Sequence, residues 1–77
     1  MKYPISDKMK DLIEETFTFH PVQPGQAERY EAIRAKAKEM ATLIAELSPA
    51  SAEQTLSFRH LQEAVMFANA SIAIHEA

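Results

Sequence analysis

Apolar positions repeat with the period of an α-helix in three separate segments of the chain, and the clearest repeat spans residues 26–47. Its apolar side chains recur at alternating spacings of three and four residues, which places them on one face of a helix. They are Tyr30, Ile33, Ala37, Met40, Ile44 and Leu47. Good helix formers fill the other positions, and neither glycine nor proline interrupts them. The pattern predicts one long helix with a single apolar face.

A second long helix is predicted over residues 51–75, and it carries two apolar stripes. One stripe consists of Phe58, Leu61, Val65, Ala68 and Ile72, and the other of Leu56, Phe67, Ala70 and Ile74. The helix follows a short SPAS turn, in which Ser51 and Gln54 have the spacing of a capping box. Because the turn is so short, the two long helices must lie antiparallel as an αα-hairpin.

The first part of the chain holds a shorter helical pattern and a linker. Residues 6–18 begin with Ser6, a good N-cap residue, and continue with apolar side chains at helical spacing. The linker, residues 19–25, contains two prolines and the only glycine, which break regular structure. We therefore predict an all-α fold in a single domain, residues 1–77: a short N-terminal helix followed by a long antiparallel αα-hairpin.

The second stripe of the last predicted helix has no partner within one hairpin. Residues 64–74 include no charged side chain, and a helix that is apolar on all sides is normally surrounded by protein. A chain of 77 residues without cysteine is also short for a stable monomer. We therefore expect a homo-oligomer whose C-terminal halves pack together. A monomeric three-helix bundle of alanine-rich composition is the alternative.

Charge and composition disfavour several classes of protein. The formal net charge is −3, whereas proteins that bind polymeric nucleic acid rely on a cationic surface, so we expect no such partner. The longest apolar run is too short to cross a bilayer, and we find no signal-peptide pattern, so we expect no membrane partner. The lack of cysteine suits a reducing cytoplasm. The expectation is a soluble, intracellular protein.

No catalytic or cofactor motif is recognisable. No nucleophile has a histidine and an acid at a familiar spacing, and one glycine cannot build a phosphate-cradling loop. The histidines, His20, His60 and His75, are too scattered for a zinc site. We expect a binding protein rather than an enzyme, with no metal and no cofactor.

Half of the eight basic residues lie within ten positions near the start of the segment 26–47. They are Arg29, Arg34, Lys36 and Lys38. A helix start favours anions, and arginine binds phosphate bidentately, so this cluster is suited to a small anionic ligand. The alternative is a solvated helix face, on which Glu31 pairs with Arg34 and Lys36 pairs with Glu39. Both interpretations remain open on spacing alone.

Several rings surround the linker, and one polar side chain interrupts the apolar run after it. The rings are Phe17, Phe19, His20 and Tyr30, which can stack on a nucleotide base. Alternatively, Phe17 or Phe19 pins the first helix to the hairpin and His20 caps a turn. Asn69 is the only amide in its apolar run, and counting back across the turn places it opposite Tyr30. It either lines a site there or fixes helix register and oligomeric state. Arg59 is expected to face the middle of the other long helix, near Met40. It either holds a ligand between subunits or pairs with Glu63, the role that the spacing favours.

The ordered set of residues resembles a family of small phage proteins. It opens F-x-F-H-x-x-x-P-x-Q-x-E-R-Y-E-x-I-R, continues A-K-x-x-A-x-x-I and S-P-x-S, and closes L-x-x-A-V-M-F-A-N-A-S-I-A. Over residues 17–74 this is similar to the helical hairpin domain of the anti-CBASS and Thoeris anti-defence proteins. The resemblance implies a hexameric sponge in the bacterial host cytoplasm. Such a sponge sequesters cyclic di- or trinucleotides, or cyclised ADP-ribose, without cleaving them.

The resemblance also implies roles for individual residues. Phe19 looks like the aromatic that stacks on the ligand, where the family often has tyrosine, and Arg34 looks like the basic residue that contacts phosphate. Arg59 looks like the arginine of a separate site for cyclic trinucleotides, and Asn69 is similar to a polar position that can line the pocket. The additions that shape a pocket for cyclised ADP-ribose in some relatives are missing here, so the preferred signal stays open.

Two other functions stay open beside the sponge. An oligomeric helical adaptor that binds another protein through its apolar stripe predicts that Phe19 and Arg34 are dispensable. A hydrolase of cyclic nucleotides predicts linear products, and the missing metal ligands disfavour it.

Overall fold

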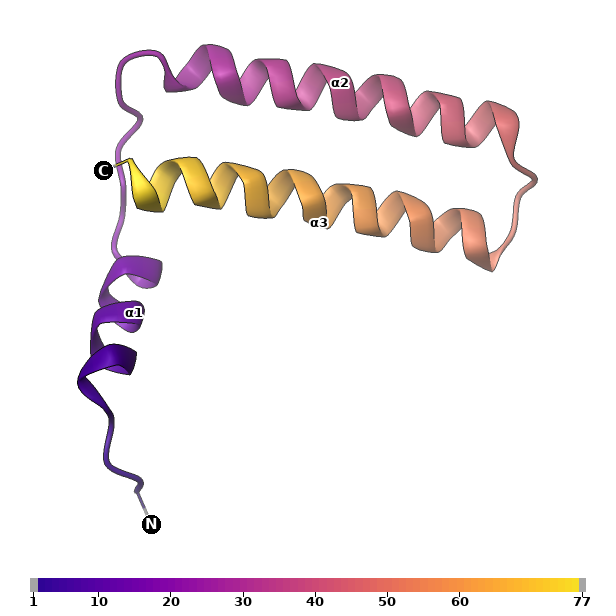
Figure 1. Cartoon of the computed structure of the whole chain (residues 1–77). Helices are drawn as coiled ribbons and strands as arrows, with labels where there is room; N and C mark the ends of the chain where they lie inside the picture. Colours follow the sequence, from indigo (N-terminus) through magenta and orange to yellow (C-terminus); the bar gives the residue numbers. More distant parts are fainter. Residues whose placement is uncertain (1, 77) are drawn as a thin grey trace.

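The computed structural model describes residues 2–76, and these residues form three α-helices and no strand. Helix α1 spans Asp7–Phe17, α2 spans Gln26–Leu47 and α3 spans Ala52–His75. Helices α2 and α3 run antiparallel, and α1 projects away from the open end of this hairpin (Figure 1). The prediction of an all-helical hairpin fold is confirmed.

Side chains at the helix ends explain where α1 and α3 begin. The Ser6 hydroxyl accepts a hydrogen bond from the backbone N–H of Met9 at 3.1 Å, which satisfies one of the unpaired donors of α1. At α3 the Ser51 hydroxyl accepts from the N–H of Gln54 at 3.0 Å. Of the predicted capping box, only this contact forms, and the Gln54 side chain does not accept from the backbone N–H of Ser51. The Gln54 amide instead reaches across the turn and donates to the carbonyl of Ser48 at 2.9 Å, which ties α3 to the end of α2.

The hairpin seam lies where a straight helix places it, not where a strict seven-residue repeat does. The half-buried positions of α2 and its C-cap that face α3 are Tyr30, Ile33, Ala37, Ala41, Ile44 and Ser48. The predicted seam residues Met40 and Leu47 are 49% and 79% exposed, and Phe58 of α3 is exposed as well. A straight helix of 3.6 residues per turn drifts by about 20° per heptad from a period of 3.5. Towards the turn the contact therefore passes from Met40 and Leu47 to Ala41 and Ser48.

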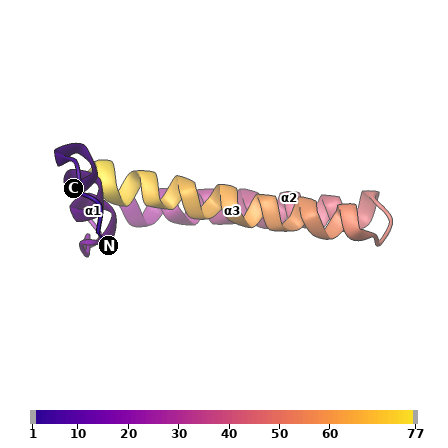
Figure 2. The ribbon, with the colours of Figure 1, turned by 90° about the horizontal axis from the view of Figure 1, so that it is seen from below.

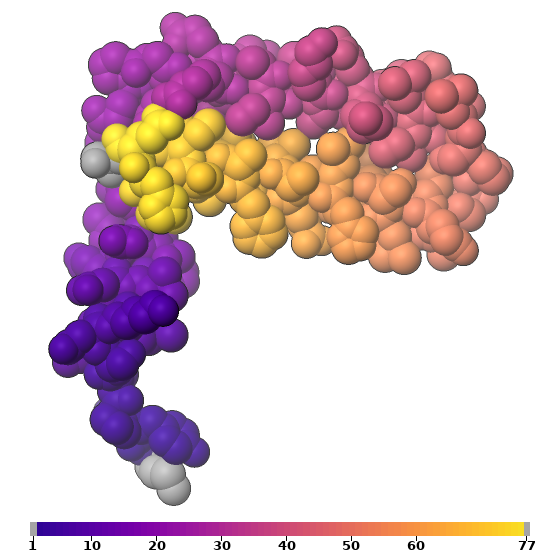
Figure 3. Space-filling model, viewed as in Figure 1, coloured from indigo at the N-terminus to yellow at the C-terminus, as the bar shows by residue number. Residues whose placement is uncertain are grey.

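The described residues of a single chain form no apolar core. Among residues 2–76 no apolar side chain is fully buried, and the hairpin is one layer of helices in a molecule only 14 Å thick (Figure 2). The space-filling view shows α1 as a separate arm, and every residue of α1 is exposed (Figure 3). Helix α1 therefore does not complete a three-helix bundle with α2 and α3. None of the described helices has the length and apolar character needed to cross a membrane.

Candidate ligand-binding site

A shallow recess lies between the first half of α2 and the last third of α3. Its volume is about 330 Å³, and it is lined by Tyr30, Arg34, Asn69, Ala70 and Ala73. We refer to these five residues as the recess. Tyr30 and Arg34 are one turn apart on α2, so their side chains emerge on neighbouring parts of the same face. Asn69 lies beside Tyr30, as the count across the turn predicted. The structure thus brings together three of the seven candidate site residues.

The Asn69 side chain leaves one polar atom without a partner. Its Oδ1 is buried and accepts no hydrogen bond from the described residues. An unsatisfied buried acceptor costs about 1–3 kcal/mol, and native proteins contain few of them. Because Asn69 lines the recess, a ligand or another copy of the chain can bring the donor that this atom lacks.

Arg34 lines three neighbouring hollows on the surface of the hairpin. It lines the recess and also an adjoining apolar hollow of about 380 Å³, which includes Phe58 and Met66. It pairs with Glu31 one turn earlier, and Lys36 pairs with Glu39 at 3.3 Å, so both ion pairs of the solvated-face interpretation are present. Exposed pairs of this kind are weak, so the Glu31 contact leaves the Arg34 guanidinium free to bind an anion.

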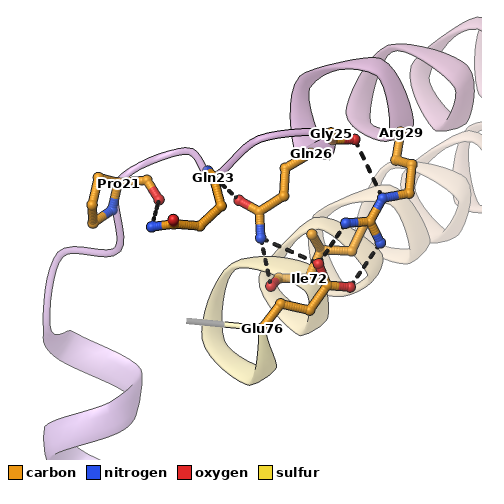
Figure 4. Close-up of polar contacts among 7 residues, drawn as sticks. All are labelled: Pro21, Gln23, Gly25, Gln26, Arg29, Ile72 and Glu76. Carbon is orange, nitrogen blue, oxygen red and sulfur yellow. Dashed lines mark hydrogen bonds and ion pairs between the residues drawn. The ribbon is translucent and has the colours of Figure 1, made fainter.

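Arg29 is held by the far end of the chain. Its Nη1 and Nη2 donate to the two carboxylate oxygens of Glu76 at 2.7 and 2.5 Å, and its Nε donates to the carbonyl of Gly25 at 3.4 Å (Figure 4). The hydrogen bonds from Arg29, and then from Gln26, lower the pKa of Glu76 to about 2, while desolvation opposes the shift. The pKa of Arg29 is raised, first by the hydrogen bond to Glu76.

Gln26 is the most buried side chain of the described residues, only 2% exposed. Its Oε1 accepts from the backbone N–H of Gln23 at 2.8 Å, and its Nε2 donates to the Ile72 carbonyl at 3.4 Å and to Glu76 Oε1 at 3.3 Å (Figure 4). We call Gln26, Arg29 and Glu76 the polar latch. It joins the linker, the start of α2 and the end of α3.

Sequence reasoning missed Gln26 and Glu76. Glu76 lies 47 positions from Arg29, so no local spacing pairs the two. The available signal was the count across the turn, which places the end of the last helix beside the linker and so brings the side-chain carboxylate of Glu76 towards Arg29.

Phe19 and His20 lie in the linker, outside the recess. The Phe19 ring is 84% exposed. His20 is half-buried, and its Nε2 donates to the backbone carbonyl of Glu15 at 2.7 Å, which ties the linker to the end of α1. Phe19 is therefore accessible for stacking but does not reach the recess of its own chain.

Arg59 is exposed and lies apart from the recess. It is two residues from the seam positions Ser57 and Leu61, so its side chain points away from α2 rather than towards Met40. The favoured pairing with Glu63 is wrong: Glu63 faces His60, with 3.7 Å between Glu63 Oε1 and His60 Nδ1. The structure leaves the Arg59 guanidinium in solvent.

One family of proteins matches this chain. Residues 9–73 match the family model described as Acb2/Tad1, hairpin domain. The matched range takes in most of α1, the whole of α2 and nearly all of α3, with the linker and the recess between them. No curated protein and no solved structure matches the chain.

Proposed function

The chain belongs to the Acb2/Tad1 hairpin-domain family of phage anti-CBASS and anti-Thoeris sponge proteins, and from this premise we propose that it sequesters a cyclic nucleotide immune signal. The proposed signals are cyclic di- and trinucleotides, with cyclised ADP-ribose as a further member of the class. The protein binds the signal in the cytoplasm of the bacterial host and does not cleave it. Sequestration requires only affinity and concentration, so no reactive group is needed.

The observation that carries this proposal is the recess. It places an arginine, a tyrosine and an asparagine with an unpartnered buried oxygen around one hollow. Arginine recognises phosphate oxygens through paired N–H donors. The buried Asn69 Oδ1 lacks a hydrogen-bond donor, and nucleotides carry such donors on their base edges and ribose hydroxyls. The three side chains together therefore suit a nucleotide better than a simple anion.

The recess of one chain is too small and open to enclose a cyclic nucleotide. Its volume of about 330 Å³ lies at the lower end of the range for small-molecule sites, about 300–1,000 Å³. The proposed stacking residue, Phe19, lies outside it. We therefore propose that a second copy of the chain completes the site, with Phe19 of one copy stacking on a ligand whose phosphate contacts Arg34 of another.

Exposed apolar surface supports the assembly that this arrangement requires. Phe67 is 71% exposed, and Met66 beside it is also exposed, both on the half of α3 that carries no charge. Small residues on the same half, among them Ala64, Ala68 and Ser71, allow other helices to approach closely. We propose a homo-oligomer in which the C-terminal halves pack together. The expected assembly is a hexamer, and Arg59 belongs to a separate site for cyclic trinucleotides.

The test is a calorimetric titration of the protein with cyclic di-AMP, cyclic di-GMP, cyclic GMP–AMP, cyclic tri-AMP and cyclised ADP-ribose. Each mixture is then boiled, and the released ligand is identified by chromatography. Tight binding with intact release supports a sponge. Linear products indicate a hydrolase instead, and the absence of binding to every member favours an adaptor that uses the exposed apolar surface.

Arg34 and Lys36 provide a matched pair of variants. Each is basic and pairs with a glutamate three residues away, but only Arg34 lines the recess. Arg34→Ala removes charge-assisted hydrogen bonds worth about 1.5–3 kcal/mol, so the dissociation constant should rise roughly 10- to 100-fold. Lys36→Ala should change it less than about threefold. Equal effects of the two substitutions contradict a phosphate contact at Arg34.

A further inference from the structure

The most buried side chain of the described residues is a glutamine at the first position of α2. A buried amide needs partners for its oxygen and for both N–H groups. Gln26 has all three: it accepts from Gln23 and donates to Ile72 and Glu76. None of these partners lines the recess, so the amide is satisfied within the protein and is not free to bind a ligand.

The hydrogen bonds of Gln26 fix the direction in which the linker leaves the hairpin. The backbone of Gln23 is held against α2 by Gln26 Oε1, and the Gln23 side chain in turn donates to the Pro21 carbonyl at 3.2 Å. Pro21 and Pro24 each lock one backbone torsion angle, which removes freedom from the stretch between them. The chain is therefore restrained at Pro21, Gln23, Pro24 and Gln26, and Pro21 lies two residues after Phe19.

The other side of Phe19 is also restrained. His20 donates to the Glu15 carbonyl in the last turn of α1, so the residue that follows Phe19 is tied to the arm. At the hairpin, the Arg29–Glu76 ion pair holds the end of α3 against Gln26. The exposed ring is thus carried on a backbone that contacts of Gln26 hold on the hairpin side and a contact of His20 holds on the α1 side.

We propose that Gln26 is a positioning residue that presents Phe19, in advance of binding, to the ligand held in the recess of another copy. This inference rests on the proposed function, because it assigns Gln26 a part in the same site. Gln26 acts through the linker and does not touch the ligand. A side chain placed in advance does not have to be ordered on binding, which improves affinity.

The decisive experiment is a double-mutant cycle between Gln26→Ala and Phe19→Ala. Cyclic GMP–AMP is the probe, cyclic tri-AMP is titrated in parallel, and helix content is checked by circular dichroism for every variant. In the Phe19 background, Gln26→Ala should raise the dissociation constant roughly 2- to 12-fold, the cost of ordering one side chain. In the Phe19→Ala background it should change the constant less than about twofold, because the positioned ring is already absent.

The outcomes of the cycle separate a failure of the positioning role of Gln26 from a failure of the proposed function. An equal loss in both backgrounds shows that Gln26 acts on the fold rather than through Phe19 and overturns the inference, as does no loss in the first background. If neither probe binds the unsubstituted protein, the cycle is run with whichever member of the panel does bind; if no member binds, the proposed function fails and the inference fails with it. If the probes bind and only the coupling is missing, the proposed function stands.

A rescue variant guards against simple misfolding. Gln26→Glu keeps the acceptor for the Gln23 N–H but places a second carboxylate against Glu76, so it should weaken binding as Gln26→Ala does. Adding Glu76→Gln restores an N–H donor facing a carboxylate, although the Ile72 carbonyl still lacks its donor and Arg29 loses its carboxylate partner at position 76, so the double variant should recover part of the lost affinity. Failure of the exchanged pair to recover any affinity contradicts the positioning role.

A spectroscopic variant reports on the ring itself. The chain contains no tryptophan, so Phe19→Trp introduces a single indole at the proposed stacking position. Saturating cyclic GMP–AMP should quench this fluorescence, and Gln26→Ala should reduce the quenching at saturation. Equal quenching at saturation with and without Gln26 shows that the ring finds the same position unaided and overturns the inference.

Discussion

The only glycine of the chain offers a sharp test of how α2 begins. Gly25 is the N-cap of α2 and has φ of 84° and ψ of −13°, in the left-handed region. A Cβ added at this position meets no atom within 4 Å, so the cost of Gly25→Ala is backbone strain and not a clash. An L-residue with a side chain pays about 1–2 kcal/mol for this conformation. Alanine also restricts the unfolded chain, which offsets about 0.4–1 kcal/mol.

The net expected effect of Gly25→Ala is a loss of about 1 kcal/mol in the free energy of unfolding. For a domain of this size the melting temperature should fall by roughly 4–8 °C. The measurement is thermal unfolding followed by circular dichroism, at one fixed chain concentration because the proposed assembly would make stability depend on concentration. The control is Gly25→Asn, since asparagine tolerates the left-handed region and should lose less. The left-handed N-cap is refuted if the alanine variant has the melting temperature of the unsubstituted protein. It is also refuted if the asparagine variant loses as much melting temperature as the alanine variant.

Three further predictions follow from individual contacts. The pKa of Glu76 falls from an ordinary 4.5 to about 2 in the folded chain, so the ionised carboxylate stabilises the fold above pH 4.5 and this effect is lost as the pH falls towards 2. Glu76→Gln should therefore flatten the fall of melting temperature over that range. An unchanged slope contradicts the Arg29–Glu76 ion pair. Asn69→Leu removes an unsatisfied acceptor, so it should preserve or raise the melting temperature while weakening binding of cyclic GMP–AMP by roughly tenfold. Thermal unfolding and a calorimetric titration check the two effects. A fall in melting temperature instead indicates that Asn69 has a hydrogen-bond partner across an interface. Phe67→Glu should reduce the mass seen in sedimentation velocity, because it places a charge on exposed apolar surface of the proposed assembly; an unchanged mass places Phe67 outside the interface.

The helices of this chain are readable from its sequence because helical periodicity is a local property. Ser6 and Ser51 mark the starts of α1 and α3 through contacts only three residues long, to Met9 and Gln54. The prediction of the seam residues was less accurate, since a seven-residue repeat in the sequence does not distinguish a supercoiled helix from a straight one. Leu47 and Ser48 are adjacent in the chain, and the accumulated drift of a straight helix decides which of them faces α3.

The candidate site was predictable only where its residues can be placed by counting along regular helices and a short turn. Asn69 could be placed beside Tyr30 because two regular helices and a short turn fix the register between them. The latch could not be found in this way. Its geometry depends on a linker conformation set by Gly25 and on the side-chain direction of Glu76 at a helix end. Arg59 was misplaced for a related reason, since spacing offered Glu63 as a partner while His60 lies nearer to that carboxylate.

The proposed oligomer would answer both the shortage of apolar core and the incompleteness of the proposed site. Fixing a backbone costs about 1–2 kcal/mol per residue, and burial of apolar side chains is the main term that opposes this cost. Among residues 2–76 the largest fully buried side chain is Gln26, so a single chain cannot supply that term alone. The residues that it leaves exposed include Phe19, the ring that the proposed ligand needs. Packing of further copies on the uncharged half of α3 buries apolar surface, and it can also bring Phe19 of one copy to the recess of another. The proposed oligomer would therefore both stabilise the hairpin and build the site, so a variant that disrupts assembly should lose ligand binding even when every recess residue is intact.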